Sequence, residues 1–356
     1  MLDYTLRQSG RASLDFLSAF GCVTPDLVAR QNQALKKAGL ADDANLADDL
    51  DERAKQVEGV LQDVPEFRAA NLIAEWHSEQ HARLAAEAFD QIADELKPQF
   101  EKFKTGKTTL KLDPNLDVPK YWLYPIHRTT GGWDAREGMG FIHGELIHRY
   151  VVGKAPRPPA AGSVAADIYA QRDLMTQQAP RRDYKKILEI GCSSGPYTRS
   201  LGRNFPEAEI WACDISAAQL EQAQRNGNAT GQAWNLFQAD GRHTGQADAS
   251  FDLVTSYIIL HELPKQVIAD ILKESFRILK PGGDLLFGDV APYREMSKLN
   301  AWRTDYAAKF GGEPYWRESS TMDVVAVMKN IGFVDVKYEG VGPTRYPWVT
   351  YGRKPA

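Results

Sequence analysis

The sequence predicts an α/β protein in which an all-helical region precedes a mostly parallel sheet. Short apolar runs alternate with helical segments from about residue 183 onward, which is typical of a parallel sheet wound by crossover helices. The first 110 residues instead carry apolar side chains at helical spacing. Because 356 residues are enough for two domains, we expect a helical domain at residues 1–110, a connector at 111–163 and an α/β domain at 164–356.

The helical region is expected to contain three shorter helices and one long one. Apolar residues recur at helical spacing near residues 11–20, 25–38 and 45–61. A long amphipathic helix then runs from a cap at Asp63 until Pro98 ends it. Its apolar face packs within the domain or against a second subunit, so a homodimer through these helices is one expectation.

The connector is rich in proline, glycine and aromatic residues, and residues 155–162 read as a linker. We expect the connector to contribute to a substrate pocket or to an interface. His143, with His148 close by in the sequence, is a candidate substrate-binding residue; the alternative is a hydrogen-bonding role between domains.

The α/β region begins with an apolar run at residues 187–190, followed by a turn with Gly191 and Gly195 and then a helix. A strand, a glycine turn and a helix N-terminus let the backbone approach a nucleotide-like ligand closely. The spacing from Glu189 is Glu-x-Gly-x-x-x-Gly, which differs from the Gly-x-Gly-x-x-Gly fingerprint of dinucleotide sites.

The strands that follow are predicted at residues 208–214, 235–241, 251–257 and 282–287. The first two end in acids, Asp214 and Asp240. Residues 332–338 and 346–351 alternate with period two and predict a final hairpin.

In combination, these motifs from about Asp183 onward resemble class I S-adenosylmethionine (SAM)-dependent methyltransferases of the small-molecule type. The resemblance implies a Rossmann-like seven-stranded sheet with an antiparallel last strand, and SAM as the cofactor. It does not extend to the N-terminal helical domain. It implies these cofactor-binding residues: Glu189, Gly191, Gly195, Asp214, Ile215, Asp240 and Gly241.

Each implied role has an alternative. Asp214 is expected to bind the ribose hydroxyls, but an acid there can also cap the helix that starts at Ser216. Asp240 with Gly241 is expected to meet adenine, or else to be part of a turn. Ile215 flanks the adenine ring or belongs to the core.

The candidate catalytic residues are His261 and Glu262, which follow the fourth strand. Ligands bind at the carboxyl ends of parallel strands, and an imidazole that titrates near neutrality suits proton abstraction. We therefore expect O-methylation of a small molecule with His261 as general base. The alternatives are C- or N-methylation, a nucleic-acid methyltransferase, a non-catalytic SAM-binding module, or a structural role for His261.

The segment 291–320 carries six aromatic residues, among them Trp302 and Tyr306. Such a segment predicts a cover over a flat or apolar acceptor, with these two residues binding substrate. The alternative is that the aromatic residues attach the segment to the N-terminal domain.

Composition limits the other classes of function. A net charge of −4 without a basic block disfavours a nucleic-acid partner. No apolar run suits a membrane span or a signal peptide, and three cysteines without metal-type spacing suggest reduced thiols in the cytoplasm. His77 and His81 lack the spacing of a zinc-protease motif, so no metal is expected.

Overall fold

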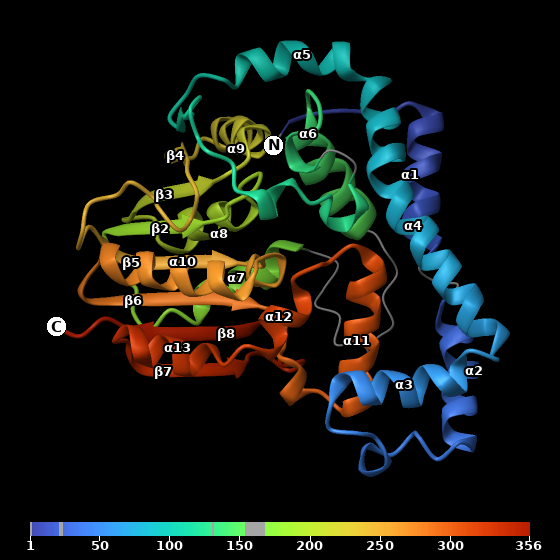
Figure 1. Cartoon of the computed structure of the whole chain (residues 1–356). Coiled ribbons are helices and arrows are strands. Elements are labelled where there is room, and N and C mark those ends of the chain that lie inside the picture. The colour runs from blue at the N-terminus through green and yellow to red at the C-terminus, as the bar shows by residue number, and fades with distance from the viewer. Residues whose placement is uncertain (1, 21–23, 130–131, 154–167) are drawn as a thin grey trace.

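The computed structural model describes residues 2–20, 24–129, 132–153 and 168–356. These residues form an eight-stranded sheet with helices on both faces, and the N-terminal helices stand beside one end of it (Figure 1). The strand order is β1-β4-β3-β2-β5-β6-β8-β7. The strands are β1 (Thr109–Lys111), β2 (Lys186–Ile190), β3 (Glu209–Asp214), β4 (Trp234–Gln238), β5 (Phe251–Tyr257), β6 (Leu279–Asp289), β7 (Val334–Gly340) and β8 (Trp348–Arg353).

Strands β1 to β6 pair in parallel, whereas β8 pairs antiparallel with both β6 and β7. The predicted Rossmann-like seven-stranded sheet with an antiparallel last strand is confirmed by β2 to β8. The predicted final hairpin is β7 and β8.

Strand β1 is an addition that the sequence did not predict, and it lies at the predicted boundary between the helical domain and the connector. Leu110 pairs with Leu236 of β4, and the Thr108 hydroxyl donates to the Gln232 carbonyl (2.9 Å). Without β1, the backbone groups along that side of β4 would form an open sheet edge, which proteins usually cover.

Two apolar clusters fill the two faces of the sheet. The helices of this half are α7 (Ile168–Gln177), α8 (Pro196–Asn204), α9 (Ala217–Ala229), α10 (Lys265–Ile278), α11 (Lys298–Gly311), α12 (Trp316–Thr321) and α13 (Val324–Ile331). One cluster lies under α10 and α13 and includes Val254, Ile271 and Met328; the other lies under α7, α8 and α9 and includes Leu201, Leu220 and Trp234.

The N-terminal region confirms the three shorter predicted helices, but the single long helix is wrong. The chain turns at Ile92, and Pro98 lies inside the second helix instead of ending the first. The turn directs Phe100 back onto Phe141 (ring centroids 5.8 Å apart), so burial of this ring favours a bend over a straight helix. Val64 precedes the first turn in place of Asp63. The helices are α1 (Gln8–Phe20), α2 (Thr24–Lys37), α3 (Leu50–Leu61), α4 (Pro65–Asp90) and α5 (Ala93–Lys102).

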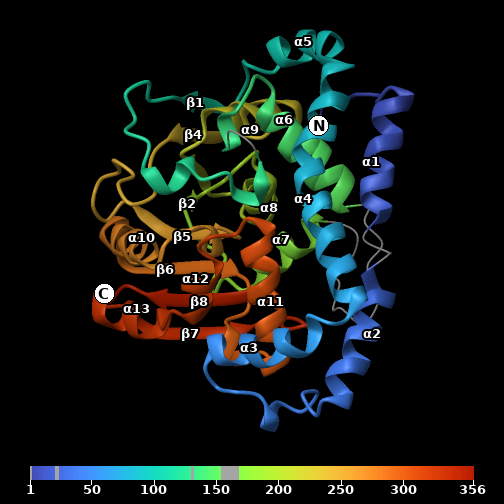
Figure 2. The ribbon, with the colours of Figure 1, turned by 45° about the vertical axis from the view of Figure 1, so that its right-hand side comes forward.

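The connector places a short helix, α6 (Met139–Phe141), and a π-helix (Ile142–Val152) between α4 and the sheet. The predicted linker at 155–162 lies outside the described residues. In Figure 2, α3 lies against α11 at the lower edge of the molecule, and α4 runs up one side of it. Within the described ranges, no helix is long and apolar enough to cross a membrane.

Candidate functional site

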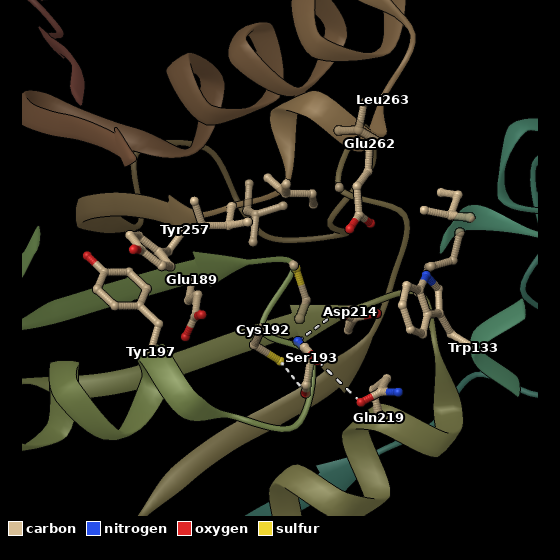
Figure 3. Close-up of a pocket in the computed structure, with 18 of the residues that line it drawn as sticks. Trp133, Glu189, Cys192, Ser193, Tyr197, Asp214, Gln219, Tyr257, Glu262 and Leu263 are labelled. Atoms are coloured by element: carbon tan, nitrogen blue, oxygen red, sulfur yellow. Dashed lines mark hydrogen bonds between the residues drawn. The ribbon is translucent and has the colours of Figure 1, made fainter. Parts of the chain in front are cut away.

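A cavity of about 240 Å³ lies where β2, β3 and β5 end, which is the usual place for a ligand in a parallel sheet. This volume is just below the range of about 300–1,000 Å³ that is typical of ligand pockets. Its floor is the glycine turn after β2, and its roof comes from the connector. Figure 3 shows Glu189 of β2, Asp214 of β3 and Glu262 of the turn after β5 around it, with Trp133 opposite.

The glycine turn needs its glycines for two physical reasons. Gly191 and Gly195 have φ angles of 74° and 85°, which other residues rarely adopt. A Cβ atom at Gly191 would also lie 2.3 Å from Ile259 on the neighbouring turn. The backbone N–H of Ser193, in the middle of the turn, donates to Asp214 (2.8 Å). The turn therefore exposes backbone to the cavity in a fixed shape.

Asp214 lines the cavity at the tip of β3. Each of its carboxylate oxygens accepts one backbone N–H, from Ser193 and from Ser216 (2.9 Å). Burial raises the pKa of Asp214 to about 6. Because a carboxylate oxygen has two lone pairs, each can still accept a ligand hydroxyl. The cap of α9 is the Ser216 hydroxyl itself, and Ile215 also lines the cavity.

Glu189 is a buried carboxylate at the end of β2, and it too lines the cavity. The Thr198 hydroxyl donates to it (2.6 Å), and burial raises its pKa to about 8. A buried acid with a raised pKa is stabilised in its ionised form by a cation. Glu189 therefore suits the positively charged part of a ligand.

Asp240 and Gly241 differ in their access to the cavity. Gly241 lines it, and a Cβ atom there would lie 2.7 Å from Ile190. The Asp240 carboxylate is held by Arg242, whose Nη2 lies 2.6 Å from Oδ2. Asp240 is outside the cavity lining, so its role in adenine binding stays a prediction without geometric support.

His261 lies on the short turn after β5, buried and at the cavity wall. Its Nδ1 is 2.7 Å from Oδ1 of Asp289, at the end of β6. The other oxygen of Asp289 accepts the N–H of Leu260 (2.7 Å), which fixes the carboxylate. Burial opposes the charge of His261, but Asp289 and then Glu262 raise its pKa to about 9. The pair has the geometry of an oriented base, and Nε2 of His261 lies 4.0 Å from Oε1 of Glu262, which also lines the cavity.

The connector forms the opposite wall, through Trp133, His143 and His148. The π-helix explains why two histidines five residues apart lie together, with ring centroids 4.3 Å apart. A π-helix has more residues per turn than an α-helix, so positions i and i+5 share a face. Burial lowers the pKa of His148 to about 3 and that of His143 well below its ordinary value, so both are neutral near pH 7.

The other predicted substrate residues, Trp302 and Tyr306, are outside the cavity lining. They pack against Phe67 of α4, with ring centroids 6.3 and 5.3 Å away. The Trp302 indole also donates to Glu58 of α3 (3.3 Å). The structure places both where the alternative expectation had them, between segment 291–320 and the N-terminal helices. Trp316 of the same segment instead packs against His261, with the two ring centroids 4.6 Å apart.

The comparison with protein families agrees with the geometry. Residues 187–283 match the model of the family described as methyltransferase domain. The chain therefore contains a class I SAM-dependent methyltransferase domain, and SAM is its cofactor.

The comparison with curated proteins finds relatives that share only this domain. A malonyl-[acyl-carrier protein] O-methyltransferase of Legionella pneumophila is 31% identical over 35% of this chain and 41% of the relative. A ribosomal RNA small subunit methyltransferase C of Hahella chejuensis is 28% identical over 32% of this chain and 33% of the relative. The chain thus spans half or less of the length of these relatives.

Among solved structures, a phosphoethanolamine N-methyltransferase 2 of Haemonchus contortus in complex with SAM is similar in part. It has a TM-score of 0.43 and 15% identity, and the alignment covers 54% of this chain and 53% of that one.

The residues of the methyltransferase domain fit SAM. Among the described residues, no cation pairs with the buried Glu189 carboxylate, and the ammonium group of the cofactor would supply one. The side-chain nitrogen of Gln219, at the cavity wall, is buried without a hydrogen-bond partner among the described residues. In the described part of the chain, no group of three or more His, Cys, Asp or Glu residues is arranged to hold a metal ion.

Three residues of the methyltransferase site were missed by the sequence interpretation. Asp289 ends a strand, as Asp214 does, so the same pattern of an acid at a strand tip could have identified it. His127, at the cavity wall, comes from the connector, and its partner Glu313 follows α11, so the two meet only through the tertiary fold. No local pattern signals such a meeting.

Proposed function

We propose that this protein is a SAM-dependent methyltransferase that methylates an oxygen atom of a small, aromatic or apolar molecule, with His261 as general base. The observation that supports it best is that His261, oriented by Asp289, shares one cavity with Asp214 and the glycine turn.

The proposed reaction is a displacement in line with the bond to the methyl group. Bound SAM supplies an activated methyl group on a positively charged sulfur. The acceptor hydroxyl gives its proton to Nε2 of His261 while its oxygen forms the bond to the methyl carbon and the carbon–sulfur bond breaks. Asp289 holds the resulting imidazolium in place. The positioning of donor and acceptor contributes the remaining part of the rate enhancement.

The connector supports an acceptor with a flat or apolar surface. Tyr121, Trp122, Ile126 and Trp133 line the cavity. Aromatic walls favour ring stacking and apolar contacts with small ligands. The neutral imidazoles of His143 and His148 can each donate or accept one hydrogen bond, so they suit a polar substituent on such a molecule.

Other acceptors remain alternatives of lower rank. One relative is named as an O-methyltransferase of a malonyl thioester on a carrier protein, which has a carboxyl acceptor. A carboxylate is already ionised near neutral pH and would need no base. A ribosomal RNA acceptor, as in the name of another relative, is disfavoured by the net charge of −4. Carbon and nitrogen acceptors also stay open.

The pH dependence of turnover tests the role of His261. The neutral imidazole of His261 is the active form. Because the pKa of His261 is raised to about 9, the neutral form is lost as the pH falls below about 9. We expect kcat/KM for a phenolic acceptor to rise with pH and to level off near pH 9. The assay measures release of S-adenosylhomocysteine over a panel of phenols and carboxylic acids.

The matched variants are His261→Gln and His243→Gln. His261→Gln should lower kcat by about a hundredfold or more without changing SAM affinity. His243 is outside the cavity lining, so its variant should behave as the native protein does. A flat pH profile with full activity of His261→Gln would remove the base from this account and favour a carboxyl acceptor.

We also propose a homodimer through the N-terminal helices. Phe16 of α1 and Leu72 and Trp76 of α4 are exposed by 50%, 69% and 37%, and the rings of Phe16 and Trp76 are 6.0 Å apart. Clustered exposed apolar side chains mark interaction surfaces.

Light scattering should give twice the monomer mass for the native protein, and Leu72→Glu should reduce the measured mass to that of the monomer. Leu112→Glu, at an exposed apolar residue outside this surface, is the control; a monomeric native protein would refute the proposal.

The cytoplasm is the location we propose. Cys192 and Cys213 are buried free thiols, as expected for a reducing compartment.

A further inference from the structure

The connector carries an unusual backbone segment next to the cavity. His127 and Arg128 both have φ angles of 55°, in the left-handed region that residues other than glycine seldom occupy. Such a strained conformation persists only where surrounding contacts enforce it. Contacts with the end of α11 and with α4 hold this segment in place.

The segment is held against the end of α11. The His127 backbone N–H donates to the Gly312 carbonyl (3.0 Å), and the Arg128 guanidinium donates through Nε to the Phe310 carbonyl (2.9 Å). Arg128 also forms ion pairs with Glu75 and Glu79 of α4 (3.2 and 2.9 Å). Residue Gly312 permits this approach, since a Cβ there would lie 2.8 Å from the Arg128 nitrogen.

The strained backbone directs the His127 ring between two carboxylates. Its Nδ1 lies 2.5 Å from Oε1 of Glu313, and its Nε2 lies 3.3 Å from Oε1 of Glu262. The second oxygen of Glu313 is buried and makes no hydrogen bond to the described residues. Although burial opposes its charge, the two carboxylates raise the pKa of His127 to about 10, so it is an imidazolium near neutral pH.

Glu262 joins this ion bridge to the proposed base. The Glu262 oxygen that meets His127 lies 4.0 Å from Nε2 of His261. The result is a row of alternating charges, of which the middle three members line the cavity: Asp289, His261, Glu262, His127 and Glu313. It crosses four separate elements, which are the end of β6, the turn after β5, the connector and the end of α11.

We infer that His127 is a positioning residue of the methyl-transfer centre, which with Glu313 holds Glu262 against the His261 base and so completes that base from the connector. This inference rests on the proposed function. Without His127, the buried Glu262 carboxylate would lose its nearest cation, and His261, 4.0 Å away, would be the cation left beside it among the described residues. The connector and α11 thereby contribute to catalysis as well as enclosing the cavity.

The charges that face His261 come from each element around it: Asp289 from β6, Glu262 from its own turn and Glu313 from the end of α11 all raise its pKa. Removal of a carboxylate should therefore lower the pKa of His261. Removal of the His127 imidazolium makes the same cluster more negative and should raise it. Opposite signs from two neighbouring substitutions are the signature of the charge row.

The test is a histidine titration by NMR of the full chain, with His261 assigned through His261→Gln. We expect Glu313→Gln to lower the pKa of His261 by about 0.5 to 1, and His127→Gln to raise it by a similar amount. The double variant should return it close to the native value. Glu79→Gln, which removes an ion pair of Arg128 but no member of the row, should leave it unchanged.

The outcomes separate the two proposals. Unchanged titration in both single variants, or shifts of the same sign, would overturn the positioning role, because a merely structural change has no reason to alternate in sign. The titration needs neither SAM nor an acceptor, so the proposed base can fail in the activity assay while the charge row is confirmed.

Discussion

Asp214 and Asp240 both follow a strand of the sheet, but their carboxylates have different neighbours. Asp214 accepts two backbone N–H groups and still faces the cavity, whereas Asp240 is paired with Arg242 away from it. An ion-paired carboxylate has few lone pairs left for a ligand. We therefore expect Asp214 to contribute more to cofactor binding than Asp240, although both residues show the same sequence pattern.

Asparagine substitutions at these two positions measure the difference. Asp214→Asn should weaken SAM binding by about 1–3 kcal/mol, the scale for a hydrogen bond to a buried charged group. Asp240→Asn is the matched control and should have a clearly smaller effect. Calorimetric titration with SAM gives both values. Equal losses would place Asp240 at the adenine after all, and an unchanged Asp214 variant would contradict its contact with the ribose.

At the scale of elements, helix α9 begins with help from the connector. The Asp134 carboxylate accepts the Ser216 hydroxyl and the Ala218 N–H, both at 2.8 Å. An acceptor at a helix N-terminus satisfies N–H groups that have no partner within the helix. Asp134 thereby ties the connector to the element that follows the Asp214 strand.

Removal of this contact should loosen the connector. Asp134→Ala should cost about 1 kcal/mol, the usual scale for a helix cap, whereas Asp134→Asn keeps an acceptor oxygen and should cost less. Thermal unfolding measures the stability, and hydrogen exchange over residues 132–152 measures the loosening. If the two variants behave alike, the carboxylate does not act as a cap.

The π-helix shows where element prediction from sequence stops. His143 was expected near a substrate pocket, and the structure places it at the cavity wall. His148 lies beside His143 because the π-helix has a wider turn than an α-helix. The π-helix also packs closely against the glycine turn, since a Cβ at Gly144 would lie 2.4 Å from Ser194. Residues far apart in sequence select this winding, so the local pattern could not predict it.

For the whole molecule, the sequence predicted the sheet well because each strand and its following helix carry their own periodicity. The glycine turn and Asp214 were found for the same reason, since they occupy fixed places at strand tips. Contacts between the halves were predicted only as the alternative to substrate binding. Trp302 was expected at the substrate and instead packs on α4, because an aromatic pattern states that a face is buried but not against what.

The central claim is that one cavity, closed by the connector, holds the cofactor and the acceptor side by side. A crystal structure with S-adenosylhomocysteine tests it most directly. We predict that the ribose lies on Asp214 and that the sulfur faces His261, with open space beyond it bounded by Trp133 and His143. A ligand bound elsewhere, or a sulfur turned away from His261 toward a wall with no space beyond it, would contradict the account.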